Sequence, residues 1–339
     1  MRGVTARVYT DGERLALGAG ATSVHWIEGR PVFTLGDGSV IAPGDGVSSR
    51  IKAHDGAILC AAPDPGGHRI VTGGDDGQLL AIDPKGAFER LGAYPGKWID
   101  HVVASPASGL VVASVGKEAK VFKRQRGFVS GVEDHSFAHP STVGGLALDA
   151  KGRRLAASHY GGVTVRYAMM SDDKGVELKW AGSHLAVTLS PDAEYVISGM
   201  QENALHGWRL PDKIDLRMDG YPSKTRSFSW DKRGRWLATS GANAAIVWPF
   251  VGKLGPQGKA PLQPGEREAL VTAVAFHPSE EVLAIGYADG AAILVRLADQ
   301  SGAELDEPGE GAVTALAWSA DGKRIAIGDE AGRGAIIDL

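Results

Sequence analysis

Histidines and carboxylates occur along the chain at positions that a fold could bring together as metal ligands. The candidates are His101, His159 and His184, with Asp100 or Glu202 as an acidic partner. Imidazole nitrogens and carboxylate oxygens suit divalent transition metals. A hydrolase could be built on such a site. However, ten histidines in 339 residues are no enrichment. Binding of a divalent metal or small ligand at the central channel of the fold is therefore our alternative hypothesis.

A glycine-rich stretch, GGDDGQLLAID from Gly73 to Asp83, could cradle a phosphate or form a turn. A phosphate-binding P-loop requires GxxxxGK[ST] after a strand, and no glycine-rich segment of the chain completes that pattern. The same plan of small residue, polar turn and apolar run recurs at Thr34–Ala42, Gly199–Trp208, Ser240–Trp248 and Gly286–Val295. We therefore interpret the stretch as a turn that joins two strands.

Other signatures of catalysis are absent from the sequence. It contains no HExxH, no GxSxG and no paired cysteines, which are the short motifs of metalloproteases, serine hydrolases and zinc modules. Cys60 is the only cysteine, so no disulfide can form within the chain. We expect Cys60 to be a small buried apolar residue. The sequence thus predicts a protein that is not an enzyme and that requires no cofactor.

Composition and charge exclude further classes of function. The net charge of −4 provides no field to attract nucleic acid or anionic lipid. No apolar run approaches the ~20 residues that span a bilayer, and the N-terminus lacks a secretory signal. We therefore expect a cytoplasmic protein that binds neither nucleic acid nor membrane.

The elements that position these residues follow from internal repeats. Apolar segments, each followed by a reverse turn and a second apolar segment, recur about every 40 to 47 residues, which is the period of a four-stranded propeller blade. Forty-seven glycines and seventeen prolines supply the turns. The pattern predicts an all-β propeller of four-stranded antiparallel blades, with eight blades favoured and seven as the alternative. The predicted blade cores lie near 22–43, 57–83, 98–123, 142–168, 183–209, 224–250, 270–297 and 312–339.

These units resemble the WD-repeat β-propeller family, in a degenerate and bacterial form. The best match is Ala53–Asp83, in which His54 precedes the first strand, Asp76 lies in a turn, and Ile82-Asp83 takes the place of the Trp-Asp pair. No unit has a literal Trp-Asp at that place. The family's hydrogen-bonded network of His, Asp, Ser/Thr and Trp is also incomplete in every unit. One unit has His54, Thr72 and Asp76, and another has His184, Ser198 and Trp208.

The last unit ends on its third strand at Leu339. We expect Val4–Tyr9 or Arg14–Gly18 to supply the fourth strand, because a ring closed by the N-terminal strand leaves no exposed sheet edge. Residues 1–339 would then form a single domain.

The resemblance implies a non-enzymatic scaffold that presents a rigid propeller face to a protein or peptide. Large polar and aromatic residues interrupt the small residues that otherwise precede the first strand of each unit. Such residues suit an interface. The predicted partner-binding residues are Lys97, Trp98, Asp100, His101, His159, Tyr160, His184, Met200, Gln201, Tyr221, Lys224 and Arg226.

Overall fold

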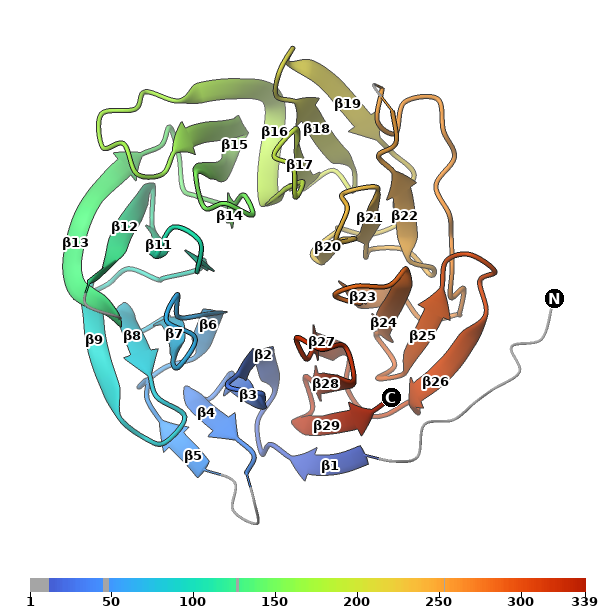
Figure 1. Cartoon of the computed structure of the whole chain (residues 1–339), viewed down its shortest axis with the longest axis horizontal. Helices are drawn as coiled ribbons and strands as arrows, with labels where there is room; N and C mark the ends of the chain where they lie inside the picture. The colour runs from blue at the N-terminus through green and yellow to red at the C-terminus, as the bar shows by residue number, and fades with distance from the viewer. Residues whose placement is uncertain (1–11, 45–48, 126–127, 253) are drawn as a thin grey trace. The chain divides into compact units, whose positions relative to one another are not determined.

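The computed structural model describes residues 12–44, 49–125, 128–252 and 254–339, and all regular elements in these ranges are β-strands (Figure 1). The all-β prediction is therefore confirmed. The described residues contain no helix with the length and apolar character to cross a membrane. The chain divides into two compact units, which we describe one at a time.

One unit comprises Val32–Met218. Most of its strands are short and end at turns rich in glycine, as the repeat pattern predicts, but β15 and β16 have 14 residues each. They are β3 (Arg30–Leu35), β4 (Ser39–Ala42), β5 (Ser49–Lys52), β6 (Ile58–Pro63), β7 (Ile70–Gly74), β8 (Gln78–Ile82), β9 (Phe88–Ala93), β10 (Val102–Ser105), β11 (Leu110–Val115), β12 (Glu118–Gln125), β13 (Phe128–Ala138), β14 (Gly145–Leu148), β15 (Arg154–Tyr167), β16 (Val176–Leu189), β17 (Tyr195–Met200), β18 (Leu205–Arg209) and β19 (Ile214–Met218).

The other unit comprises the chain up to Pro31 together with Asp219–Leu339. Its strands are β1 (Gly12–Ala16), β2 (Ala21–Ile27), β20 (Phe228–Trp230), β21 (Trp236–Thr239), β22 (Ile246–Pro249), β23 (Val271–Phe276), β24 (Val282–Tyr287), β25 (Ala292–Arg296), β26 (Gly302–Asp306), β27 (Val313–Trp318), β28 (Arg324–Asp329) and β29 (Arg333–Asp338).

These strands build a β-propeller of seven antiparallel sheets, the alternative count rather than the favoured eight. Five sheets have four strands: β2-β3-β4-β5, β6-β7-β8-β9, β10-β11-β12-β13, β23-β24-β25-β26 and β1-β29-β28-β27. The sheet β20-β21-β22 has three. After it, the described residues of the connection 250–268 contribute a single bridge, from Leu262 to Val247, in place of a fourth strand.

The difference between eight sequence units and seven sheets arises in the six-stranded sheet β14-β15-β16-β17-β18-β19. The first half of β15 pairs with β14, and its second half, from Tyr160, pairs with β16. Likewise, the first half of β16 pairs with β15, and its second half, from His184, pairs with β17. Because β16 continues unbroken, the predicted fourth and fifth units share one sheet.

The N-terminal strand completes the last sheet, as predicted. β1 pairs with β29 along its whole length, from Gly12 opposite Ile337 to Ala16 opposite Arg333. Leu17, which follows, is fully buried, and its N–H donates to the carbonyl of Gly332. Of the two candidate segments, Arg14–Gly18 overlaps this strand, whereas Val4–Tyr9 lies outside the described residues.

The hydrophobic core lies between neighbouring sheets. In the Val32–Met218 unit, Val71, Leu79 and Leu91 of one sheet pack against Val111 and Phe122 of the next. Similar clusters form between later sheets in both units, and another lies within the six-stranded sheet. Each sheet is too thin to bury its own faces, so packing between sheets holds the strand ends and their turns in place.

Candidate functional site

Each sheet has two ends that carry different connections. Because consecutive strands are antiparallel, the turn between the second and third strands lies at the same end as the connection to the next sheet. We call this end the bc edge. The other end, which carries the first and third turns, we call the ab edge. In the six-stranded sheet β15 changes partner at Tyr160 and β16 changes partner at His184. For this sheet the bc edge is therefore the end that carries Tyr160, Ser183 and the β17–β18 turn, and the ab edge is the end that carries the β15–β16 turn. In the Val32–Met218 unit the predicted residues Trp98, Tyr160 and Gln201 all lie at the bc edge.

Trp98 lies in the connection from β9 to β10 and is 63% exposed. The backbone of this connection is fixed at both sides of the indole. The N–H of Lys97 donates to the carbonyl of Tyr94 at 3.1 Å, and the N–H of Ile99 donates to the carbonyl of Gly74 at 3.1 Å. Ile99 itself is fully buried. The buried Ile99 therefore anchors a loop that holds Trp98, and the exposed Lys97 beside it, in solvent.

Tyr160 and Gln201 lie on either side of Ser183 in the six-stranded sheet. Tyr160 is opposite Ser183 in the β15–β16 ladder, and the N–H of Gln201 donates to the carbonyl of Ser183 at 3.0 Å. The N–H of Tyr160 also donates to Ser141 Oγ at 2.9 Å. The Tyr160 side chain is 67% exposed, and Gln201 is exposed as well. These two side chains therefore share a fixed, accessible edge.

Sequence reasoning missed two apolar residues of the same edge. Leu185 is 40% exposed and Trp180 is 36% exposed, and both belong to the part of β16 next to Ser183. Side chains alternate along a strand, so the burial of His184 turns Leu185 outward. That alternation was the signal available in the sequence.

Three other predicted residues of this unit are buried, contrary to the surface role predicted for them. His159 Nδ1–H donates to the carbonyl of Tyr160 at 2.9 Å, and His159 Nε2 lies 2.9 Å from Thr164 Oγ1. His184 Nδ1 lies 2.7 Å from Ser198 Oγ, and Nε2 lies 3.0 Å from the carbonyl oxygen of Trp180. Burial lowers the pKa of His184. Met200 is buried too. These side chains stabilise the turns and are unavailable to a partner.

Asp100 and His101 are partly buried where the chain enters β10. The backbone N–H of His101 donates to Ser114 Oγ at 3.0 Å, and the N–H of Ser114 donates to the carbonyl of His101 at 2.9 Å. Burial lowers the pKa of His101, although the nearby Asp100 acts in the opposite direction. His101 is therefore a largely neutral side chain beneath the edge.

Tyr221, Lys224 and Arg226 belong to the other unit. Tyr221 is buried: its hydroxyl lies 2.7 Å from Thr239 Oγ1 and accepts from Trp248 Nε1 at 2.7 Å. Burial raises its pKa to about 12. Lys224 is half-buried and Arg226 is exposed. The prediction that Tyr221 faces a partner is wrong, because the hydroxyl is used within its own sheet.

No metal centre forms from the predicted donors. Among the described residues, no three His, Cys, Asp or Glu side chains are grouped so as to hold an ion. His101, His159 and His184 are not brought together. Cys60 is half-buried rather than fully buried as expected. Desolvation raises the pKa of its thiol, which donates to the carbonyl of Ile99 at 3.1 Å.

The three family positions present in one unit, His54, Thr72 and Asp76, form a hydrogen-bonded network without the Trp. His54 is buried, with Nδ1 3.0 Å from the Asp76 carboxylate and Nε2 2.8 Å from Thr72 Oγ1. The backbone N–H groups of Asp55 and Gln78 also donate to Asp76. This network ties the start of one sheet to its bc turn and holds the edge rigid.

Comparisons with known proteins agree with this description. A family model described as WD domain, G-beta repeat matches residues 46–83, the unit that contains His54. Curated relatives include the U3 small nucleolar RNA-associated protein 15 homologs of Xenopus tropicalis, 22% identical over 197 residues, and of Gallus gallus, 26% identical over 154 residues. These matches cover 54% and 45% of this chain but only 37% and 29% of the relatives. The chain thus spans about a third of the length of the curated relatives that it matches.

Solved structures show the same fold over more of the chain. The crystal structure of the computationally designed Ika8 protein has a TM-score of 0.75 and 18% identity, and the match covers 98% of this chain and 99% of that one. A chain of the mitotic checkpoint complex has a TM-score of 0.67 and 11% identity, with coverage of 83% and 87%. The relatives come from a frog and a bird, so the bacterial assignment stays a prediction.

Proposed function

We propose that this chain is a non-enzymatic scaffold that binds a protein or peptide at the bc edge of its Val32–Met218 unit. The observation that carries the proposal is the exposure of two large aromatic side chains, Trp98 and Tyr160, on loops whose backbones are fixed by hydrogen bonds. Trp and Tyr are the residues most enriched among interface anchors. A rigid edge loses little conformational entropy when a partner binds.

The surroundings of the two aromatics support a protein partner. Leu185 and Trp180 add apolar surface beside Tyr160, and Lys97 and Gln201 add polar groups. An apolar centre with polar neighbours is the usual composition of a protein interface. WD-repeat propellers typically bind proteins. The frog and chicken relatives are RNA-associated by name, and we infer that this chain, with its net charge of −4, would join such an assembly through protein contacts.

Affinity purification from the native cell, followed by mass spectrometry, tests the proposal. Wild type is compared with Trp98→Ala, Tyr160→Ala and the control Tyr167→Ala. Tyr167 is 49% exposed but lies at the ab edge of the same sheet. We expect a partner whose recovery falls at least about tenfold in the Trp98 and Tyr160 variants and is unchanged in the control. Because the three side chains are exposed, thermal unfolding should remain near that of wild type.

Once the partner is purified, its affinity for wild type and for each variant can be measured directly. If it binds the Trp98→Ala and Tyr160→Ala variants as tightly as wild type, this edge is not the interface. Tyr221→Ala is unsuitable as a probe, since loss of its buried hydroxyl would disturb Thr239 and Trp248.

A further inference from the structure

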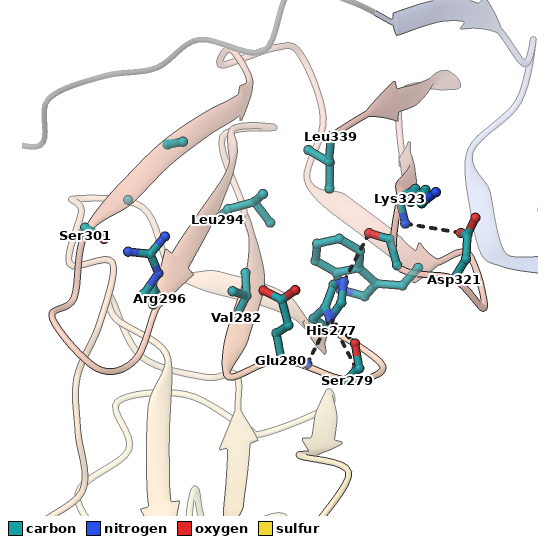
Figure 2. Close-up of a pocket in the computed structure, with 14 residues that line it drawn as sticks. His277, Ser279, Glu280, Val282, Leu294, Arg296, Ser301, Asp321, Lys323 and Leu339 are labelled. Atoms are coloured by element: carbon teal, nitrogen blue, oxygen red, sulfur yellow. Dashed lines mark hydrogen bonds between the residues drawn. The ribbon is translucent and has the colours of Figure 1, made fainter.

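A pocket of about 550 Å³ opens at the ab edge of the unit that contains Asp219–Leu339. It lies between the β23–β26 sheet and the sheet of β27, β28 and β29 (Figure 2). Its walls come from the β23–β24 turn, the β25–β26 turn, the β27–β28 turn and Leu339. Its volume is in the range of sites that bind small ligands or short peptide segments. None of its residues belongs to the bc edge described above.

One wall of the pocket carries apolar side chains because of the strand register. Leu294 lies opposite Ala284 on one side and Ala303 on the other, and Val282 lies opposite Arg296. Partners across an antiparallel ladder project to the same face, so Val282, Leu294 and Ala303 form one wall. Trp318 of the next sheet packs against the same hydrophobic cluster. The pocket is the place where this core stays open to solvent.

The opposite wall is rigid before any ligand arrives. His277 is buried, and Figure 2 shows it bridging two turns. Its Nε2–H donates to the carbonyl of Gly322 at 3.1 Å, while Nδ1 accepts from the N–H of Glu280 at 3.0 Å. The Trp318 indole donates to the carbonyl of Ala275 at 3.0 Å, and its ring meets His277 edge to face at 4.7 Å.

Gly322 is required for this contact. It adopts a φ of +73°, and a Cβ there would lie only 2.0 Å from His277 Nε2. Any other residue at this position would push the imidazole away and open the wall.

Charged side chains surround the mouth in balanced numbers. Arg296 and Lys323 provide two positive charges, and Glu280 and Asp321 provide two negative charges. Asp321 already accepts from Ser319 Oγ at 2.6 Å and from the N–H of Lys323 at 3.2 Å. This arrangement gives no net attraction for a polyanion. Long donors on one side and a carboxylate on the other instead match the N–H and C=O groups of a peptide main chain.

We propose that this pocket binds a segment of a partner protein that inserts one large apolar side chain, such as Leu or Phe, and carries no net charge. The apolar interior takes the side chain, and the balanced mouth takes the main chain. An apolar centre with a polar periphery is also where interface energy concentrates. This site is separate from the bc edge, and its proposal stands whether or not Trp98 and Tyr160 bind a partner.

The test uses synthetic fluorescent heptapeptides of Gly and Ser with Leu or Phe at the centre, and the same peptides with Ser at the centre. Anisotropy should show saturable binding of the apolar peptides to wild type below about 1 mM and none of the Ser-centred peptides. Ala303→Phe fills the pocket and should weaken binding at least about tenfold. Lys or Asp flanks should change the affinity less than about fivefold.

Leu339→Asp provides a second variant in case Ala303→Phe disturbs the fold. Leu339 is 39% exposed and lines the pocket, so the charge should block an apolar side chain without affecting the core. Leu254→Asp is the matched control, because Leu254 is 59% exposed in the same unit but does not line the pocket. It should bind as wild type does.

Three outcomes would overturn the proposal. The first is absence of binding to wild type, and the second is equal binding to wild type and to both pocket variants. The third concerns the chain itself, since Gly12 lies opposite Ile337, two residues before Leu339. If only a chain shortened to begin at residue 10 binds the apolar peptides, the occupant is the chain's own N-terminal segment rather than a partner.

Discussion

Single histidines illustrate what a side chain contributes at the same place in different repeats. His54 and His184 each contact a hydroxyl of the neighbouring strand, Thr72 and Ser198. In the sheet of β20, β21 and β22, Tyr221 reaches Thr239 instead. The common requirement is a buried ring with a polar atom that meets a buried hydroxyl. The sequence showed that His54, Thr72 and Asp76 occur at the family spacing, but it did not predict that these three form a network without the Trp. It did not predict that Tyr221 would serve the same purpose.

The pH dependence of stability should depend on His139. This side chain is buried, and its burial, together with Arg166 and His159, lowers its pKa from 6.5 to about 4. In the unfolded chain it takes up a proton near pH 6.5, whereas the folded chain resists protonation down to about pH 4. The contribution of neutral His139 to folding stability is therefore fully present above pH 6.5 and is lost as the pH falls toward 4. Between pH 7 and 5 this contributes a loss of about 2 kcal/mol.

Urea unfolding of wild type and His139→Gln at both pH values measures this contribution. The variant should lose about 2 kcal/mol less than wild type over the same interval, whatever its stability at pH 7. His68→Gln is the control, since His68 is exposed. An identical pH dependence in wild type and His139→Gln would show that the pKa of His139 is the same in the folded and the unfolded chain.

At the scale of strands, the alternation of apolar and polar residues predicted where elements lie but not how they join. The predicted fourth and fifth units each have their strands, yet β16 pairs with β15 of the fourth unit and with β17 of the fifth. Gly182, with a φ of +116°, lets the chain change direction there without a break. Because hydrophobic periodicity is the same in a continuous and in an interrupted strand, the sequence could not distinguish seven sheets from eight.

Removal of β1 should lower the free energy of unfolding, whereas removal of only the residues before β1 should not. A chain that starts at residue 19 loses the β1–β29 ladder and the fully buried Leu17. The burial of one Leu side chain contributes about 1.5–3 kcal/mol. The shortened chain would also expose β29 as an edge strand, which favours aggregation.

A chain that starts at residue 12 keeps the whole ladder and is the control. Chemical denaturation should show a loss of at least about 2 kcal/mol for the shorter chain relative to this control, and size-exclusion chromatography should show its self-association. Equal stability and equal elution of the two chains would mean that β1 contributes nothing to the last sheet.

For the chain as a whole, the net charge predicts weak binding to nucleic acid. The net charge is −4, and affinity for RNA depends mainly on cations that neutralise phosphates. We expect no retardation of a labelled single-stranded RNA of about 20 nucleotides at about 150 mM salt in a gel-shift assay. Saturable binding at this salt concentration would contradict that expectation and would direct attention to the RNA-associated relatives.

The fold was more predictable than the site. Repeats of turn and strand identified the propeller and the strand that completes its last sheet, because every unit repeats the same signal. Of the predicted site residues, Trp98, Tyr160 and Gln201 are exposed and their role stays a prediction, whereas His159, His184, Met200 and Tyr221 proved to be buried. The sequence shows which residue type is unusual in a repeat, but not whether a neighbouring hydroxyl or carbonyl will satisfy it. The pocket near Trp318 was missed because four segments form it through packing between sheets.

The pairing of β1 with β29 also sets an order of events during synthesis. β1 is synthesised before every other described strand, and its partner β29 is synthesised after all of them. The last sheet therefore cannot be completed until β29 has been made, and until then the nascent chain presents β1 as an unpaired strand.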